Sequence, residues 1–216
     1  MQKSDDIADP STEPQCRARG RPRAFDRDVA LDAATRLFWQ KGYEATSISD
    51  LTRAMGIGSP SLYAAFGSKD ALFVEALQHY ADRHGPLVWG GFFAASTARD
   101  AVRALLLDSA MALAGAQDLP LGCMVTLSSV GDEGCSGLGE RLRAARAVTL
   151  ERLRTRLDAA VASGELAKSA DVHALARFVQ TVQNGMSILA RDGASSEELR
   201  AVADVAMLSW DAQTGR

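Results

Sequence analysis

The sequence is poor in cysteine and holds no long apolar run. Cys16, Cys123 and Cys135 are an odd number without metal-site spacing, so we expect reduced thiols, no bound metal and a cytoplasmic protein. No apolar stretch approaches ~18 residues, which predicts no membrane span. The first 16 residues are polar and acidic, unlike a secretory signal, and their composition favours disorder.

Catalytic motifs are also missing. The chain contains no phosphate-binding glycine loop, no G-x-G-x-x-G after a strand, no H-E-x-x-H and no G-x-S-x-G. Its histidines are scattered, and the neighbouring carboxylates of Glu197 and Glu198 fall at the start of an expected surface helix. We therefore predict that the protein is not an enzyme and has no catalytic residues, no metal ligands and no cofactor.

Charge is unevenly distributed along the 216 residues. The net charge is −3, and 47% of the residues are hydrophobic, enough for a sizeable core. Residues 17–69 contain nine Lys and Arg against five Asp and Glu, whereas the segments on either side are acidic. A concentration of positive charge in one segment predicts contact with nucleic acid there.

Residues 47–69, SISDLTRAMGIGSPSLYAAFGSK, have the pattern of two short helices on either side of a glycine turn. Ser47 and Asp50 have the spacing of a capping box, and Gly56 suits the end of the first helix. We expect Ser59 to cap the second helix, with Pro60 at its first position. The pattern is that of a helix-turn-helix, whose second helix enters the major groove. The alternative is a hairpin used only for packing.

A third helix is predicted just before this pair, with Asp26 as its N-cap. Ahead of it, Arg17, Arg19, Arg21 and Arg23 alternate with small residues and proline, a composition that cannot pack into a core. This arm could follow phosphates or enter the minor groove, as homeodomain arms do, or it could be a solvated tail. Beside a helix-turn-helix we favour the DNA arm.

Residues 20–80 resemble the DNA-binding domain of the tetracycline-repressor (TetR/AcrR) family. The match is carried by F-x-x-K-G-Y-x-x-T-S-I, then A-x-G-I, then S-L-Y-x-x-F-x-S-K-x-x-L. The resemblance implies phosphate contacts from the second helix start, from Tyr63 and from Lys69, and base contacts from the start of the third helix. The predicted DNA-binding residues are Arg21, Thr46, Ser47, Ser59, Pro60, Ser61, Tyr63 and Lys69.

The predicted recognition helix departs from strong readers of DNA sequence, because it has no Arg, Lys, Asn or Gln. Bidentate hydrogen bonding to a base is therefore not possible from this helix. We expect specificity from Ser59, Pro60 and Ser61, from the arginines of the arm, or from DNA shape.

From residue 69 onward the sequence shows helical patterns and no strand-length alternation. Helices are predicted over about 69–84, 97–115, 121–131, 137–163, 170–191 and 195–212, with a glycine-rich connection over 85–96. The fold class is therefore all-α, with about nine helices. The predicted divisions are a disordered tail over 1–19, a three-helix DNA-binding domain over 20–68, and a helical ligand-binding and dimerisation domain over 69–216.

Two surfaces of the C-terminal helices have alternative interpretations. Arginines recur along 137–163 and could form a second nucleic-acid surface, but interspersed acidic residues favour a solvated face. The last two helices carry many apolar positions, which could serve the monomer core or a homodimer interface; the resemblance favours the homodimer. Two helix-turn-helix units about 34 Å apart would read a two-fold symmetric site on double-stranded operator DNA.

The resemblance also implies an unknown small-molecule effector held among the C-terminal helices. The candidates by position and residue type are Trp89, Phe92, Met111, Cys123, Met124 and Phe178, and plain core packing is the alternative for each. Cys123 is expected at a helix start, where a thiol pKa can be lowered, so a reactive cysteine and a buried structural one both stay open.

We thus predict a sequence-specific DNA-binding transcriptional regulator, a repressor that a small-molecule ligand releases from its operator. The alternative is a DNA-binding regulator without a small-molecule inducer, either an activator or a thiol-based redox sensor that acts through Cys123.

Overall fold

The computed structural model describes residues 25–115, 119–128 and 137–215. These residues form nine α-helices and no strand, which confirms the all-α prediction. The helices are α1 (Arg27–Lys41), α2 (Ile48–Met55), α3 (Ser59–Phe66), α4 (Lys69–Ala94), α5 (Ala98–Leu113), α6 (Met124–Leu127), α7 (Leu138–Ser163), α8 (Val172–Arg191) and α9 (Ser196–Thr214). The predicted tail, the arginine arm, Cys16 and Cys135 lie outside the described residues.

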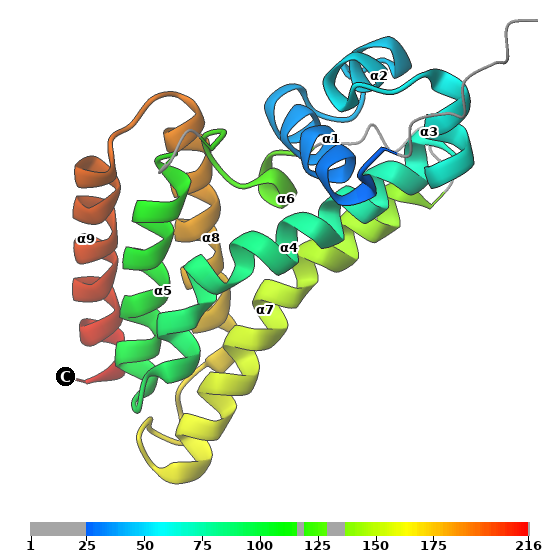
Figure 1. Ribbon diagram of the computed structural model, residues 1–216. Helices are drawn as coiled ribbons and strands as arrows, with labels where there is room; N and C mark the ends of the chain where they lie inside the picture. The colour runs from blue at the N-terminus through cyan, green and yellow to red at the C-terminus, as the bar shows by residue number, and fades with distance from the viewer. Residues whose placement is uncertain (1–24, 116–118, 129–136, 216) are drawn as a thin grey trace, which may run out of the picture.

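The helices form two groups joined by one long helix. Helices α1, α2 and α3 gather at one end of the molecule, and α5, α8 and α9 stand side by side at the other (Figure 1). Helix α4 runs from the first group to the second, and α7 extends in the same direction (Figure 1). Within the described ranges, no helix combines the length and the apolar character that crossing a bilayer requires.

The first group is organised around buried aromatic rings. Phe38 of α1 is fully buried and meets Phe73 of α4 edge-on, with ring centroids 5.0 Å apart. The same hydrophobic cluster includes Met124 of α6 and two leucines of α7, Leu138 and Leu142. The core beneath the helix-turn-helix is therefore completed by residues that come more than fifty positions later in the chain.

Helix α4 is longer than its sequence predicted. The expected glycine-rich connection over 85–96 is wrong, because the helix continues through Pro86 and ends at Ala94. A proline inside a helix costs about 3 kcal/mol, but burial of Trp89 and Phe92 beyond it offsets that cost. Gly91 lets α4 approach α5 closely, since a Cβ at this position would lie 2.5 Å from a carboxylate oxygen of Asp108.

Helix α6 is shorter than predicted. A helix was expected over 121–131; within its described part, 121–128, there is a single turn, Met124–Leu127, and Cys123 is its N-cap residue. Cys123 is therefore followed by one helical turn, where a longer helix was expected.

Candidate nucleic-acid interface and interior cavity

Helices α2 and α3 form the predicted helix-turn-helix. Ser47 caps α2: its hydroxyl accepts a hydrogen bond from the Asp50 amide, while the Asp50 carboxylate accepts one from the Ser47 amide. This backbone hydrogen bond, together with the nearby ammonium of Lys41 at 3.3 Å, lowers the pKa of Asp50. Gly56 ends α2 in the left-handed conformation, with φ of 66°. The capping box and the turn are thus as the sequence predicted.

The start of α3 differs from the prediction by one residue. Gly58 is the N-cap, so Ser59 and Pro60 are the first two helical residues and Ser59 is not the cap. Leu62 is buried in the core of the group, whereas Ser59, Pro60 and Tyr63 are exposed, and Tyr63 keeps 46% of its surface accessible. The exposed face of α3 is therefore small and uncharged, with one aromatic hydroxyl.

Thr46 does not belong to the exposed set. It has 0% of its surface accessible, and its hydroxyl donates to the Gly42 carbonyl at 2.6 Å. A side chain in this position cannot reach a phosphate, so the prediction for Thr46 is corrected. Ser47 beside it is exposed, so the predicted phosphate contact at the start of α2 stays a prediction for Ser47.

Lys69 is held in place by an aromatic ring that the prediction gave no role. The Lys69 ammonium lies 4.2 Å from the centre of the Tyr43 ring, and the Tyr43 hydroxyl donates to the carboxylate of Asp70. Tyr43 itself is buried. The sequence signal for it was present in the K-G-Y motif, although a supporting role cannot be read from a motif alone.

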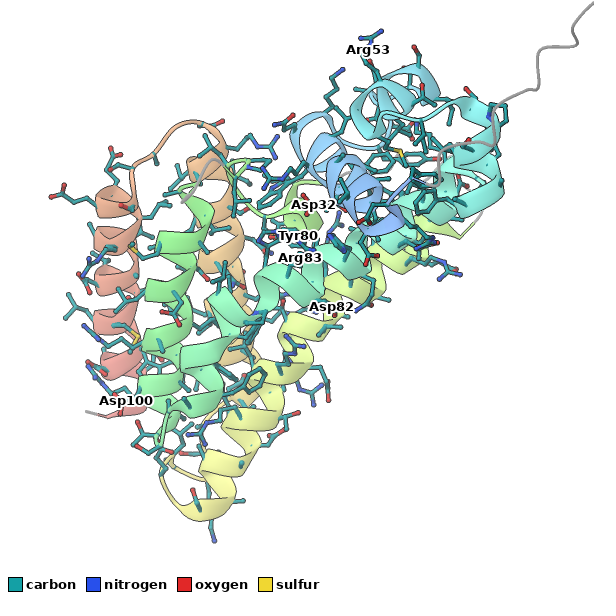
Figure 2. All side chains as sticks on the ribbon, viewed as in Figure 1. Asp32, Arg53, Tyr80, Asp82, Arg83 and Asp100 are labelled. Atoms are coloured by element: carbon teal, nitrogen blue, oxygen red, sulfur yellow. The ribbon has the colours of Figure 1, made fainter. Side chains whose placement is uncertain are left out.

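The described part of the helix-turn-helix region carries no net charge. Residues 25–69 contain five basic and five acidic side chains, so the positive excess of 17–69 comes entirely from the arginine arm. Arg27 is paired with Glu75 at 2.6 Å, and Arg36 with Asp32 at 3.2 Å. Arg53, which the prediction omitted, projects from α2 away from the C-terminal helices (Figure 2). It forms no ion pair with any described residue.

A cavity of about 870 Å³ lies between α4, α7 and α8. Two predicted ligand residues, Trp89 and Cys123, line it. Phe92 and Met124 are buried in the two hydrophobic clusters and do not. The lining also excludes two predicted residues that lie on the outer surface: Met111, with 52% of its surface accessible, and Phe178, with 37%. The four residues outside the cavity are corrected as ligand candidates.

Two ionisable side chains in the wall of the cavity have shifted pKa values. Burial raises the pKa of Tyr80 well above its usual range, and the adjacent thiol of Cys123 adds to this. Burial lowers the pKa of His84, which keeps the imidazole neutral at neutral pH. Both rings pack against Trp39 of α1, at 4.8 Å and 5.1 Å between centroids. The cavity wall is therefore in direct contact with the first helix of the helix-turn-helix group.

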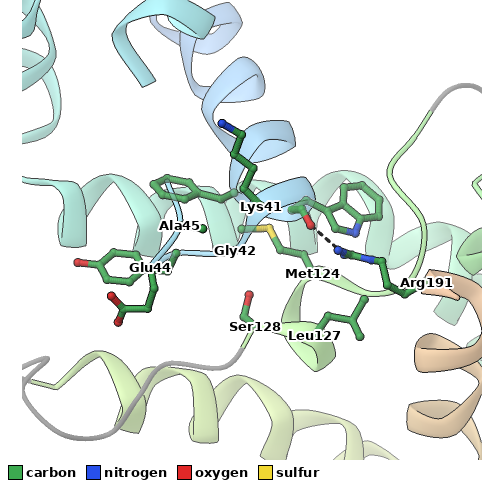
Figure 3. Close-up of a pocket in the computed structure, with 11 residues that line it drawn as sticks. Lys41, Gly42, Glu44, Ala45, Met124, Leu127, Ser128 and Arg191 are labelled. Carbon is green, nitrogen blue, oxygen red and sulfur yellow. Dashed lines mark hydrogen bonds between the residues drawn. The ribbon is translucent and has the colours of Figure 1, made fainter. Parts of the chain in front are cut away.

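A second connection joins α8 to α1. The Arg191 guanidinium donates to the Trp39 carbonyl at 2.9 Å (Figure 3). It also donates to the Gln40 carbonyl at 3.3 Å. It also donates to the Leu121 carbonyl at 3.1 Å, while the Trp39 indole donates to the Gly122 carbonyl at 3.0 Å. We call these residues, Trp39, Leu121, Gly122 and Arg191, the joint. Trp39 and Arg191 of the joint also line a small cavity of about 210 Å³ (Figure 3).

Apolar side chains remain uncovered on the last two helices. Ile188 and Leu189 of α8 and Val205 and Leu208 of α9 are exposed, and Leu208 keeps 70% of its surface accessible. The opposite sides of α8 and α9 supply Val179, Met207 and other residues to the C-terminal core. The two helices thus serve the monomer core and also present an uncovered apolar surface.

Comparisons with known proteins agree with this architecture. The family model "Bacterial regulatory proteins, tetR family" matches residues 30–76. The HTH-type transcriptional repressor ComR of Escherichia coli (strain K12) is 37% identical over 208 residues, which cover 94% of this chain and 98% of ComR. The HTH-type transcriptional repressor BdcR of the same strain is 51% identical over 69 residues, 32% of this chain and 35% of BdcR.

Solved structures extend the similarity to the whole fold. A cysteine mutant of the TetR family transcriptional regulator CifR, complexed with 26-bp double-strand operator DNA, matches with a TM-score of 0.83 and 41% identity. The match covers 88% of this chain and all of that chain (100%). From its helix-turn-helix, the family model and a relative similar along nearly the full length, this chain belongs to the tetR family of bacterial regulatory proteins and is a DNA-binding regulator of transcription.

Proposed function

We propose that the protein is a homodimeric transcriptional repressor that binds a two-fold symmetric operator through α3. The observation that carries this proposal is the exposed face of α3, where Ser59, Pro60 and Tyr63 lie opposite the buried Leu62 and Phe66. ComR and BdcR are named as repressors, and CifR is bound to operator DNA, which supports the same role here. Ser47 and Lys69 would hold phosphates, Ser61 and its neighbours would face bases, and Arg21 would reach the backbone or minor groove.

Dimerisation follows from the uncovered apolar surface of α8 and α9. Side chains such as Val205 and Leu208 expose apolar surface. Burying this surface against a second copy would stabilise the dimer by about 25 cal/mol for each Å² removed from water. A two-fold interface would place two α3 helices on successive major grooves, about 34 Å apart. Residues 20–68 would then form the reading head, and residues 69–216 the body that joins the two subunits.

Control by a small molecule is the second part of the proposal. The cavity of about 870 Å³ is within the size range of small-molecule sites. Its wall touches α1 through Tyr80 and His84, and α4 runs from the cavity to Lys69, the residue that directly follows the reading head. A ligand that moves α4 would change the separation of the two α3 helices and so weaken operator binding. We further propose that the protein works in the cytoplasm and has no catalytic activity.

A thiol-based regulator remains the second candidate because Cys123 lines the same cavity and is only partly buried. In that case oxidation of the thiol, and not a bound molecule, would alter the wall next to Tyr80. The peroxide experiment in the Discussion separates the two candidates.

The test is to map DNA bound by the protein across a genome and then measure affinity for the recovered site. We expect a discrete inverted repeat, and Lys69→Gln should weaken binding about five- to tenfold by removing a phosphate contact. Lys168→Gln makes the same charge change on an exposed residue between α7 and α8 and should leave affinity unchanged. Broad binding without a preferred site, or equal losses in both variants, would overturn the proposal.

A further inference from the structure

We propose that the cavity between α4 and α7 takes an amphipathic anion: an apolar or aromatic body bearing a carboxylate, sulfonate or similar negative group. This inference rests on the proposed function for its regulatory meaning, but the binding chemistry stands on the residues of the cavity alone.

The first argument is the charge of the lining. Arg141, Arg146 and Arg152 all line the cavity from α7. None of the three forms an ion pair within the described part of the chain. Arg146 donates to the backbone carbonyls of Val125 and Ser128, which leaves its positive charge uncompensated. Three guanidinium groups without carboxylate partners create a positive potential inside the cavity.

The acidic side chains of the described lining do not balance this potential. Among the described residues that line the cavity, Asp82 alone is acidic, and it is exposed on α4 with its carboxylate accepting a hydrogen bond from Gln78 at 2.8 Å. His84 adds no further charge at neutral pH, because burial lowers its pKa. A cationic ligand would therefore meet like charges, whereas an anion would be attracted.

The second argument is the apolar wall beside one of the arginines. The guanidinium of Arg152 lies 4.9 Å from the centre of the Trp89 ring and 5.6 Å from that of Phe93. Phe93 and Val148 are exposed although both line the cavity, so a ligand body can cover them. An apolar body against these side chains would place its negative group within reach of Arg152, because cation and rings are already in contact.

The third argument is a polar patch on α8 that faces the same space. Gln183 donates to Ser109 at 2.9 Å, and Asn184 accepts a hydrogen bond from Thr126 at 3.3 Å. The amide nitrogen of Asn184 has no hydrogen-bond partner among the described residues. Free amide and guanidinium donors are suited to anionic oxygens, since both groups donate and a carboxylate or sulfonate only accepts.

The experiment compares two fluorescent probes of nearly the same shape. 1-Anilinonaphthalene-8-sulfonate carries a negative group, and N-phenyl-1-naphthylamine is the same ring system without it. We expect the full-length protein to bind the anion more tightly, and Arg152→Gln to weaken anion binding about five- to tenfold, the range of a partly exposed charge-assisted contact. Binding of the neutral probe should stay within about twofold, since its ring contacts remain.

Two variants make the result specific to the cavity. Arg154→Gln makes the same change on an exposed residue of α7 that does not line the cavity, and it should leave both affinities unchanged. Ala145→Trp places a large ring inside the cavity and should abolish binding of both probes, which excludes attachment at the apolar surface of α8 and α9. Arg141→Gln, at another arginine of the cavity wall, repeats the charge test if Arg152→Gln lowers the melting temperature.

Equal binding of the two probes to the wild type, or losses that Arg154→Gln reproduces, would overturn the anion proposal. The function proposed above fails by a different result: anions that bind the cavity but leave operator affinity unchanged in an anisotropy titration with labelled DNA. If only a neutral compound released the DNA, control by a small-molecule ligand would be supported. The proposal that this ligand is an anion would then be overturned.

Discussion

Helices α1 to α3 and the C-terminal helices differ in the size of the cavity that they line. Around α1 the rings interlock, with Phe38 edge-on to Phe73 at 5.0 Å and Trp39 edge-on to Tyr80 at 4.8 Å. The cavity of about 870 Å³ is lined from α4, α7 and α8, with Tyr80 in its wall, whereas Phe38 and Trp39 line the smaller cavity of about 210 Å³. Protein interiors otherwise contain few voids larger than a water molecule. This difference indicates that the reading head keeps one conformation, whereas the C-terminal helices can adjust to a bound molecule.

The largest expected effect comes from removing a buried aromatic ring from the hydrophobic cluster around α1. Phe38→Ala should lower the free energy of unfolding by about 3–5 kcal/mol, because it removes a fully buried ring between Tyr43 and Phe73. Operator binding should be lost with it. Val148→Ala, on the exposed wall of the cavity, should cost less than about 1 kcal/mol. Urea denaturation of both variants would measure the contrast, and equal losses would contradict it.

The next effect concerns charge. The described residues 25–69 are electrically balanced, so we expect most of the electrostatic affinity for DNA to come from the arm. Replacing Arg17, Arg19, Arg21 and Arg23 by Gln should reduce the slope of log affinity against log salt by roughly 0.9 for each phosphate that the arm no longer neutralises. A salt series with labelled operator measures this slope. The same number of Arg→Gln changes on the outer side of α7 is the control, and an unchanged slope in the arm variant would assign the attraction to Arg53 and Lys69.

Local signals predicted the reading head well. Asp26 and Ser47 cap their helices as expected, because capping depends on residues only two or three positions apart. The order and extent of α5, α7, α8 and α9 also followed from apolar spacing. The cap of α3 was misplaced by one residue because Ser59 and Gly58 are both acceptable N-caps, and Pro60 fits the second helical position as well as the first.

The remaining predictions were wrong because they depended on packing between residues far apart in the sequence. Proline and glycine over 85–96 indicated a break, but burial of Trp89 and Phe92 kept α4 intact. Which aromatic residues line a cavity and which fill a core depends on contacts between helices, so only Trp89 and Cys123 of the six predicted ligand residues were found there. The bond from Arg191 to Trp39 joins residues 152 positions apart, and no local pattern reports it.

A smaller effect should come from breaking the joint between head and body. Arg191→Gln removes guanidinium bonds to the carbonyls of Trp39, Gln40 and Leu121, and it should lower the free energy of unfolding by about 1–3 kcal/mol. Its main effect should be on communication: the variant should bind operator but respond less to a cavity ligand. Titration of the DNA complex with 1-anilinonaphthalene-8-sulfonate measures this response. Arg200→Gln, at an exposed residue of α9, is the control. A full response to the ligand in Arg191→Gln would place the coupling in α4 alone.

The smallest expected effect is that of replacing Cys123, which packs against both hydrophobic clusters. Its thiol faces the cavity beside Tyr80, and its amide donates to the Ser187 hydroxyl at 2.8 Å, a bond that Cys123→Ser retains. If a bound molecule controls the protein, this variant should release operator at the same ligand concentration as the wild type, and peroxide should release neither. Cys135→Ser serves as the thiol control. Release of the wild type by peroxide, abolished by Cys123→Ser alone, would instead establish the thiol as the sensor, since oxidation adds a polar group to a wall that rests against α1 through Tyr80 and Trp39.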